Sequence, residues 1–262
     1  GAAYKLGPTI LWELEAEVIP IGVHPNGFNI NKECGSTSPS KMCEEVVKQG
    51  ASIGIALDGD ADRIVVCDEK GKVVDGDQIM AVIAQYQQQR GTLKGGGIVA
   101  TTMSNLALEH YLSGLGLNLK RTQVGDRYVA NCMRENGYNV GGEQSGHIIL
   151  RDHATTGDGL LAALQLLAVL AESEKPASET LHMFDPLPQK LTNVSFKGDD
   201  PTGNEQLKAA IVSAEKRLQD SGRIVIRKSG TEPVLRVMVE AEDEATLQTV
   251  MDDLLAVIDT IK

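Results

Sequence analysis

Two short apolar runs flank an acidic segment, and this arrangement limits the folds that the chain can adopt. The runs at 53–57 and 64–67 have the length and composition of buried strands. The segment between them places three carboxylates at alternate positions, Asp58, Asp60 and Asp62. Such closely spaced carboxylates repel one another unless a cation lies among them, and Mg²⁺ prefers oxygen ligands of this kind. We therefore predict a Mg²⁺ site at the end of a strand, where open α/β sheets commonly bind their ligands.

An EF-hand calcium loop and a plain acidic turn are the alternative interpretations of this segment. The three aspartates and Glu69 have the spacing of four EF-hand ligands. Arg63, however, stands where that loop needs a glycine for its sharp turn, and the flanking runs are strand-like rather than helical. A metal site in an α/β enzyme is the interpretation that we favour.

Composition argues against several classes of function. The chain of 262 residues has a net charge of −11, from 25 basic and 36 acidic side chains, which argues against generic binding to nucleic acid or to anionic membranes. The four cysteines form no CxxC pair, so we expect reduced thiols in a cytoplasmic protein. No apolar run is long enough to suggest a membrane span, and the first residues do not resemble a signal peptide.

Strand-like and helix-like segments alternate along the chain, which predicts an α/β protein. We expect strands at 17–24, 52–57, 64–68, 72–74, 97–101, 117–122, 139–141, 147–150, 191–196, 223–227 and 235–240. We expect helices at 40–49, 78–90, 105–113, 127–136, 158–172, 204–219 and 244–261. Prolines near 185–188 suggest a domain boundary. The pattern predicts two α/β domains, at 1–74 and 75–187, followed by a small α+β domain at 188–262.

A glycine-rich segment at 140–147 is a candidate sugar-binding loop. Its glycines bracket three side chains that form hydrogen bonds, Glu143, Gln144 and Ser145. Such a loop lets the backbone approach a ligand closely and offers donors and acceptors to sugar hydroxyls. A glycine-rich hairpin without a ligand is the alternative.

A basic segment at 226–233 is a candidate phosphate-binding loop. It combines cations, hydroxyls and a flexible glycine, with a further cation nearby, in Arg227, Lys228, Ser229, Gly230, Thr231 and Arg236. Backbone amides and an arginine fork suit a phosphate dianion, although a basic hairpin turn is the alternative. Arg127, at a predicted strand-to-helix turn, is a further candidate for phosphate contact, whereas the adjacent Asp126 could cap the helix.

Taken together and in this order, these segments resemble the α-D-phosphohexomutase family, and the resemblance covers essentially the whole chain. The motifs that carry it are Asp-Gly-Asp-Ala-Asp-Arg at 58–63, Gly-Glu-Gln-Ser-Gly-His at 142–147 and Arg-Lys-Ser-Gly-Thr-Glu-Pro at 227–233. The glutamine of the second motif favours the family's glucosamine branch over its phosphomannomutase/phosphoglucomutase branch. Val-Gly-Asp-Arg-Tyr-Val at 124–129 and Thr-Thr-Gly-Asp-Gly at 155–159 favour the same branch.

The resemblance implies four domains around a central cleft, with α/β domains followed by a smaller α+β domain. It implies a Mg²⁺-dependent isomerase that interconverts glucosamine 6-phosphate and glucosamine 1-phosphate, in the synthesis of UDP-N-acetylglucosamine and peptidoglycan precursors. In this family a phosphoserine donates its phosphoryl group to the sugar, and a bisphosphorylated intermediate then returns the other phosphate to the serine. A phosphomannomutase/phosphoglucomutase and a non-catalytic phosphosugar-binding module are the alternative functions.

Roles for single residues follow from the same resemblance. Asp58, Asp60 and Asp62 would bind Mg²⁺, and Arg63 would neutralise charge on the transferring group. Sugar hydroxyls would be bound by Glu143 and Ser145, with His147 either assisting or bracing their loop. The phosphate that is not being transferred would be held by Arg227, Ser229, Gly230, Thr231 and Arg236.

One motif of the family is missing from this sequence. The phosphoserine segment of the family reads Thr-Ala-Ser-His-Asn or similar, and no Ser-His-Asn occurs in the chain. We therefore expect a C-terminal piece of the enzyme, with an incomplete first α/β domain, that needs the missing N-terminal part for activity. We also expect the acidic, glycine-rich and basic segments to serve one cavity.

Overall fold

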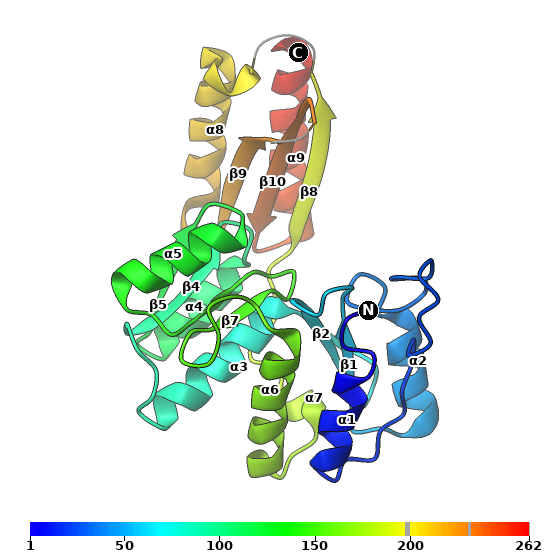
Figure 1. Cartoon of the computed structure of the whole chain (residues 1–262). Coiled ribbons are helices and arrows are strands. Elements are labelled where there is room, and N and C mark those ends of the chain that lie inside the picture. Colours follow the sequence, from blue (N-terminus) through cyan, green and yellow to red (C-terminus); the bar gives the residue numbers. More distant parts are fainter. Residues whose placement is uncertain (197–199, 230–231, 262) are drawn as a thin grey trace. The chain divides into compact units, whose positions relative to one another are not determined.

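A computed structural model describes residues 1–196, 200–229 and 232–261 (Figure 1). The chain divides into two compact units. The N-terminal unit comprises Gly1–Ser104 and Leu108–Phe184, and the C-terminal unit comprises Asn105–Ala107 and Asp185–Lys262. Among the described residues, no helix is both long and apolar enough to cross a membrane.

The first sheet of the N-terminal unit is an antiparallel meander that ends next to the acidic segment. Its strands lie in the order β1 (Ile53–Leu57), β2 (Ile64–Asp68) and β3 (Val73–Val74). Because Leu57 pairs with Ile64, residues 58–63 form the loop that joins β1 to β2. Helix α2 (Ser40–Gln49) packs its apolar side against this sheet through Met42 and Val46. The elements flanking the acidic loop are strands, so the EF-hand alternative is wrong.

The second sheet of the N-terminal unit is mixed and has the order β5-β4-β6-β7. Strand β4 (Gly97–Thr101) runs parallel to β5 (Asn118–Thr122) and β6 (Val140–Gly142), and β6 pairs antiparallel with β7 (Ile148–Leu150). All five residues of β4 are buried, as expected for a central strand that is covered on both faces.

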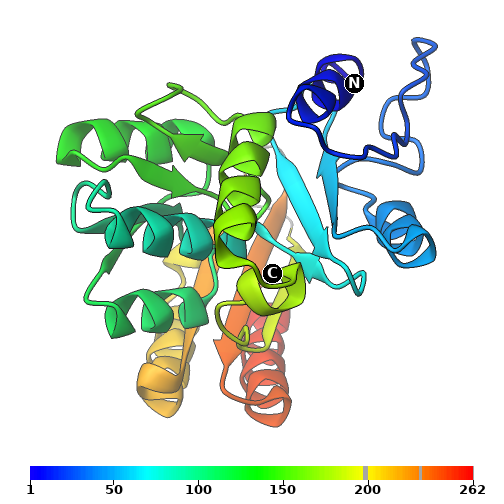
Figure 2. The same cartoon turned by 90° about the horizontal axis from the view of Figure 1, so that it is seen from below.

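Helices cover the two faces of this second sheet (Figure 2). Val99 of β4 packs into the cluster that contains Val129 and Met133 of α5 (Asp126–Asn136). Its neighbours Ile98 and Ala100 face the other way, into the main core. That core receives side chains from α3 (Gly76–Gln89), α4 (Leu106–Gly114), α6 (Gly159–Ser173) and the short α7 (Ala177–Thr180).

One continuous core joins both sheets of the N-terminal unit. Ile64 and Val66 of β2 belong to the same buried cluster as Ile98 of β4 and Leu166 of α6. A shared close-packed core holds its elements in fixed positions. The acidic loop at the end of β1 and the glycine-rich loop between β6 and β7 are therefore parts of one rigid framework.

The C-terminal unit is a three-stranded antiparallel sheet with two helices. The strands have the order β8-β10-β9, with β8 (Gln189–Ser195), β9 (Gly222–Lys228) and β10 (Val234–Ala241). Apolar side chains of α8 (Glu205–Leu218) and α9 (Glu244–Ile261) share a buried core with the sheet. Two short 3₁₀ turns flank α8, η1 (Pro201–Gly203) and η2 (Gln219–Ser221). The β-α-β-β-α order predicted for this part of the chain is confirmed.

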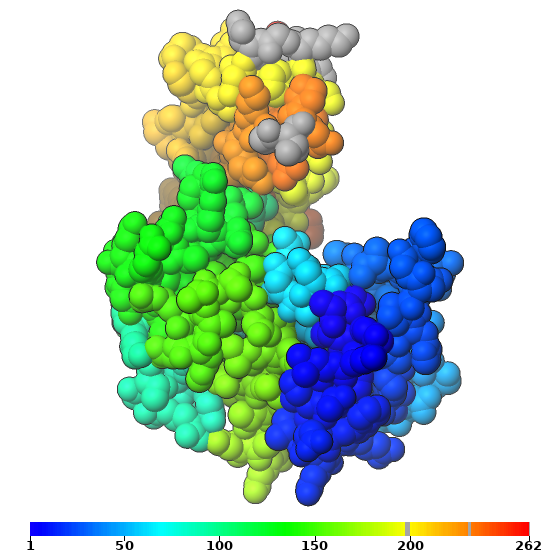
Figure 3. All heavy atoms as spheres, viewed as in Figure 1, coloured from blue at the N-terminus to red at the C-terminus, as the bar shows by residue number. Residues whose placement is uncertain are grey.

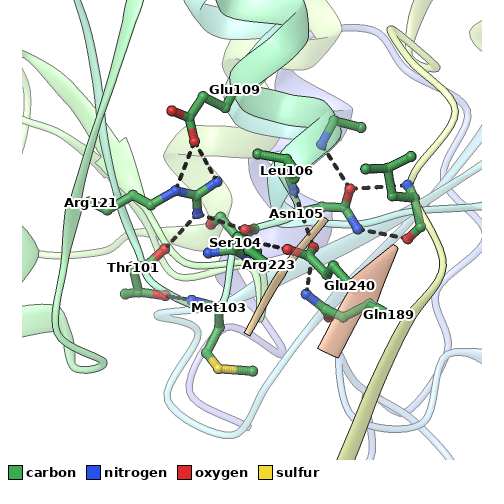
Figure 4. Close-up of polar contacts among 12 residues, drawn as sticks. Thr101, Met103, Ser104, Asn105, Leu106, Glu109, Arg121, Gln189, Arg223 and Glu240 are labelled. Carbon is green, nitrogen blue, oxygen red and sulfur yellow. Dashed lines mark hydrogen bonds and ion pairs between the residues drawn. The ribbon is translucent and has the colours of Figure 1, made fainter. Parts of the chain in front are cut away.

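Each unit also contains a polar network around a charged side chain (Figure 4). In the N-terminal unit, Arg121 pairs with Glu109 at 3.0 Å and donates to the Ser104 carbonyl at 2.7 Å. In the C-terminal unit, the fully buried carboxylate of Glu240 pairs with Arg223 and accepts from the Leu106 amide at 3.1 Å. A buried carboxylate needs such partners to offset its loss of hydration.

The structure contradicts the predicted strand at 17–24. This segment is irregular, and no strand is assigned to it. Pro20 has no amide hydrogen to donate to a sheet, and Gly22 has a left-handed φ of 68°, which an extended strand does not allow. Helix α1 (Leu6–Glu13) precedes this segment and lies at the surface of its unit, with Trp12 53% exposed (Figure 3, dark blue).

Candidate active site

The acidic loop is a tight six-residue connection closed by its own first carboxylate. Asp58 accepts a hydrogen bond from the Arg63 amide at 3.1 Å, and its carbonyl accepts from the Ala61 amide at 3.3 Å. Ala61 has a left-handed φ of 65°, which reverses the chain within the loop. Local backbone geometry therefore holds the alternating aspartates on one short turn.

The three aspartates present their carboxylates to a common point. One oxygen from each of Asp58, Asp60 and Asp62 lies within 4.8 Å of the other two. Burial raises the pKa of Asp62, and the neighbouring Asp58 raises it further, whereas His147 acts in the opposite direction. An all-oxygen, anionic donor set of this size suits a hard divalent cation such as Mg²⁺.

The glycine-rich loop is the turn between β6 and β7, and Glu143 organises it. The Glu143 amide donates to the His147 carbonyl at 3.0 Å, and the Gly146 amide donates to the Glu143 carbonyl at 2.9 Å. The Glu143 side chain accepts from the Gly125 amide at 3.0 Å and from the Ser145 hydroxyl at 3.4 Å. These contacts hold the loop against the start of α5, the helix that carries Arg127.

A hollow of about 250 Å³ opens beside this loop, and its walls mix polar and apolar side chains from Thr101, Met103, Val124, Glu143, Gln144 and Ser145. Ser145 is exposed and Glu143 is half-buried, so both side chains can reach a ligand there. The arrangement can offer carboxylate and hydroxyl groups to a polyhydroxylated molecule.

The acidic and glycine-rich loops lie directly against each other. The His147 Nδ1 atom is 3.0 Å from Oδ2 of Asp62, although the two residues are 85 positions apart. The Ile64 amide donates to the Gly146 carbonyl at 3.0 Å. Gly146 has to be a glycine, since an added Cβ would lie 1.9 Å from the Ile64 carbonyl oxygen. The structure thus brings together two segments that the sequence analysis had singled out separately.

The predicted arginines of the N-terminal unit lie at its surface. The Arg63 side chain is 43% exposed, and its Nε atom is 4.0 Å from Oδ2 of Asp58. Arg127 is exposed in the first turn of α5, donates to the Tyr128 hydroxyl at 2.7 Å and stacks on that ring. The N-cap of α5 is Gly125, so the capping role considered for Asp126 is wrong.

The basic segment of the C-terminal unit places two arginines face to face. Arg227 of β9 pairs directly with Arg236 of β10. Burial lowers the pKa of Arg227, and the charge of Arg236 lowers it further. Among the described residues, the buried Nε atom of Arg236 has no hydrogen-bond partner. Two like charges and an unpaired donor at one point are typical of an anion site.

Two predicted phosphate ligands, Gly230 and Thr231, lie outside the described residues. Ser229 is described and is buried, with its amide donating to the Val234 carbonyl at 2.9 Å. It therefore belongs to the same hairpin as the two arginines.

One contributor to the site was missed by the sequence analysis. The Gly157 amide donates to the Nε2 atom of His147 at 3.1 Å. In the sequence analysis the segment at 155–159 favoured one branch of the family and preceded a predicted helix, and no contact was expected for Gly157. Asp158 caps that helix, α6, by accepting from the Leu161 amide at 2.9 Å. The glycine in Thr-Thr-Gly-Asp-Gly was the available signal, because a cap alone does not require it.

Comparison with known protein families decides the classification. Models of three consecutive domains of the phosphoglucomutase/phosphomannomutase family match almost the whole chain. Alpha/beta/alpha domain II matches residues 1–71, alpha/beta/alpha domain III matches residues 75–187 and the C-terminal domain matches residues 191–257. The chain belongs to the phosphohexomutase family.

Relatives of this phosphohexomutase chain carry a consistent name. It is 60% identical over 259 residues to a phosphoglucosamine mutase of Parvibaculum lavamentivorans. This alignment covers 99% of the chain and 58% of the relative. It is 57% identical to a phosphoglucosamine mutase of Rhodospirillum rubrum, with the same coverage. The chain thus spans somewhat more than half the length of these curated relatives.

Solved structures of phosphohexomutases share the fold. A phosphoglucomutase/phosphomannomutase family protein from Burkholderia thailandensis superposes with a TM-score of 0.82 at 21% identity, covering 99% of this chain and 58% of that one. An Aspergillus fumigatus N-acetylphosphoglucosamine mutase, solved with GlcNAc-6P and magnesium, gives a TM-score of 0.72 at 22% identity. Its match covers 96% of this chain and 63% of that one.

Proposed function

We propose that this phosphohexomutase chain takes part in the interconversion of glucosamine 6-phosphate and glucosamine 1-phosphate. The relatives at 57% and 60% identity, each named phosphoglucosamine mutase, support the choice of sugar. The observation that carries the proposal is the contact between the acidic loop and the glycine-rich loop. In this contact His147 of the glycine-rich loop lies against Asp62 of the acidic loop. A cation site and a hydroxyl-binding loop side by side suit phosphoryl transfer to or from a sugar.

Asp58, Asp60 and Asp62 would hold Mg²⁺, whose bound charge would help to neutralise a transferring phosphoryl group. The crowding of three carboxylate oxygens within 4.8 Å supports this assignment. The magnesium complex of the Aspergillus relative supports the choice of ion. Arg63, beside Asp58, would add a second positive charge.

Sugar hydroxyls would be bound by Glu143 and Ser145, whose side chains line the hollow beside β6 and β7. Orientation of the hydroxyls by a held carboxylate reduces the entropy that the sugar loses at the reaction step. Arg127, two residues after Gly125, whose amide anchors Glu143, would contact a phosphate oxygen.

The phosphate that is not being transferred would be bound by the hairpin of the C-terminal unit. Arg227 and Arg236 supply two facing charges, and an anion between them would relieve their repulsion. Ser229, Gly230 and Thr231 complete the proposed set of ligands.

The serine that carries the phosphoryl group would come from a part of the protein outside this chain, so the chain alone would lack mutase activity. The division into domains at 1–74, 75–187 and 188–262 is part of the proposal, and the ranges of the family models support it.

A coupled assay of the full-length gene product tests this function. We expect the specificity constant for glucosamine 6-phosphate to exceed those for glucose 6-phosphate and mannose 6-phosphate, and Glu143→Gln to lose most of that activity. Higher values on mannose or glucose phosphates would assign the protein to the other branch of the family. Tight binding of phosphosugars without turnover would indicate a binding module instead.

A further inference from the structure

We propose that Asp75 and Gly76, at the start of α3, are positioning residues that hold the glycine-rich loop so that Glu143 and Ser145 face the hollow beside it. The inference rests on the proposed function, since it assumes that these two side chains bind the sugar. It gives a role in the site to two residues that act on the sugar only through the loop.

The backbone of the glycine-rich loop lies directly against the first residue of α3. The Gly76 amide donates to the Gln144 carbonyl at 3.0 Å. The first amides of a helix have no partner within the helix, so this one is available to the loop. An added Cβ on Gly76 would lie 2.2 Å from the Glu143 carbonyl oxygen and 2.8 Å from the Gly146 amide nitrogen. The loop therefore cannot approach α3 this closely unless residue 76 is a glycine.

Asp75 adds a side-chain contact to the same loop. Its carboxylate caps α3 by accepting from the Gln78 amide at 3.1 Å, and it also forms a hydrogen bond with the Gln144 side chain. Burial raises the pKa of Asp75, whereas the hydrogen bonds from the amides of Gln78 and Asp77 and from the Gln144 side chain lower it. A buried carboxylate needs such donors to offset its loss of hydration. Asp75 thus links the start of α3 to the glycine-rich loop.

Helix α3 is a rigid support for these contacts. Its side chains Ile79, Met80 and Ile83 are fully buried in the main core of the N-terminal unit. A second anchor of the loop is the hydrogen bond from the Gly125 amide to the Glu143 side chain at 3.0 Å. Small displacements of a binding group from its productive position lower the rate strongly. A shift of the loop away from α3 would therefore move Glu143 and weaken its action on the sugar.

Gly76→Ala tests the backbone contact, and Gly97→Ala is its matched control. Neither glycine has a positive φ, so alanine suits both backbones and only the new contact opposes it. Gly97 is the first residue of β4, and an added Cβ there would lie 2.0 Å from the Asn118 carbonyl oxygen. Thr101, which lines the hollow, is at the other end of that strand. Both variants thus carry a clash with a backbone carbonyl, and only one clash is at the glycine-rich loop.

The specificity constant of the full-length gene product for glucosamine 6-phosphate measures the effect. We expect Gly76→Ala to lower it roughly 10- to 100-fold and Gly97→Ala to stay within about threefold, at similar losses of stability in urea unfolding. Equal specificity constants of the two variants would overturn the inference alone. An unsubstituted enzyme without turnover of glucosamine 6-phosphate would overturn the proposed function, and the inference with it.

Two further substitutions test Asp75 without adding a clash. Asp75→Asn keeps an acceptor for the Gln78 amide and a polar partner for the Gln144 side chain, because the amide group of Gln144 can turn over. Asp75→Ser caps a helix about as well as aspartate, but its single side-chain oxygen cannot also serve Gln144. We expect Asp75→Ser to lower the specificity constant about fivefold or more, and Asp75→Asn to recover most of this loss. Equal values for the two variants would overturn the role of Asp75.

Hydrogen exchange of the unsubstituted 262-residue chain, followed by nitrogen-15 NMR, gives a readout that does not depend on how the variants fold. We expect slow exchange of the Gly76 amide, because its bond to the Gln144 carbonyl protects a position that an ordinary helix start leaves open. Exchange of this amide at the rate of an exposed one would overturn the inference, because the loop would then not be held by α3.

Discussion

Arg227 and Arg236 face each other across neighbouring strands β9 and β10, and burial and the charge of Arg236 lower the pKa of Arg227. The free chain therefore holds two like charges in a half-buried position, which costs stability unless an anion lies between them. We therefore expect an anion between the two side chains to offset this cost.

Substitution of one of these arginines separates binding from stability. We predict that Arg227→Met weakens the binding of inorganic phosphate at least about tenfold, because charged hydrogen bonds contribute about 1.5–3 kcal/mol each. The same change removes a repulsion, so the melting temperature without phosphate should not fall. Titration calorimetry and thermal unfolding measure the two quantities.

Arg217→Gln is the matched control for this prediction. Arg217 lies exposed on α8 of the same unit, outside the β9–β10 hairpin, and pairs with Asp253 of α9 at 3.3 Å. Unchanged phosphate affinity in Arg227→Met, or a loss of stability well beyond that of the control, would contradict the anion site.

The loss of one carboxylate should remove the response to metal. We predict that Mg²⁺ raises the melting temperature of the unsubstituted chain, since an ion that binds only the folded state stabilises it by mass action. Asp60→Ala should lose this response, and in the full-length enzyme it should abolish activity. Glu135→Ala, which removes an exposed acid of α5 in the same unit, is the control and should respond normally. A normal metal response in Asp60→Ala would exclude Asp60 as a ligand.

Gly157 tests how closely the His147 ring must be packed. The Gly157→Ala change would place a Cβ 2.5 Å from the buried imidazole. We predict a loss of roughly 1–3 kcal/mol in the free energy of unfolding, because overpacking forces side chains and backbone to shift. Gly114→Ala, with no atom within 4 Å of the added Cβ, should be neutral or stabilising. Equal stability of the two variants, measured by urea unfolding, would show that the contact is not restrictive.

Asp152 gives a prediction for acid stability. Its hydrogen bonds with Lys94 and Asn139, at 2.5 Å and 2.8 Å, lower its pKa in the folded chain. The ionised carboxylate therefore stabilises the fold above the ordinary aspartate pKa of about 3.9, and this contribution is lost as the pH falls through the lower, folded pKa. The side chain is 39% exposed, so solvent screening keeps the contribution small.

We predict that Asp152→Asn is less stable by about 0.5–1 kcal/mol at neutral pH. The difference from the unsubstituted chain should shrink as the pH falls below about 3.9. Urea unfolding at a series of pH values measures it. A difference that is independent of pH would show that the ionised form of Asp152 does not matter.

Local sequence patterns predicted the elements that carry the site, because those elements are apolar runs with clear ends. The strands around the acidic loop and the closing helix Glu244–Ile261 are confirmed. The expected strand at 17–24 is wrong, since a strand-like composition does not supply a partner strand and Pro20 and Gly22 oppose one.

Local sequence patterns could not predict the contacts that define the site. The bond from His147 to Asp62 joins loops that belong to two different sheets. These loops meet only in the folded chain, through the shared core and the hydrogen bond from the Ile64 amide to the Gly146 carbonyl. The need for glycine at 157 likewise comes from the ring of His147, ten residues earlier, which the fold packs against the backbone there. Periodicity describes neighbours along the chain, whereas these contacts depend on tertiary packing.

Broadening of NMR signals by paramagnetic Mn²⁺ tests most directly whether a cation binds beside the glycine-rich loop. Substoichiometric Mn²⁺ is added to the nitrogen-15-labelled chain, and the amide signals of its N-terminal unit are followed. We predict selective loss of the signals of residues 58–63 and 145–147, with recovery in excess Mg²⁺. Broadening that leaves both segments untouched, or that affects only residues 58–63, would contradict a metal site adjoining the loop of Glu143 and Ser145.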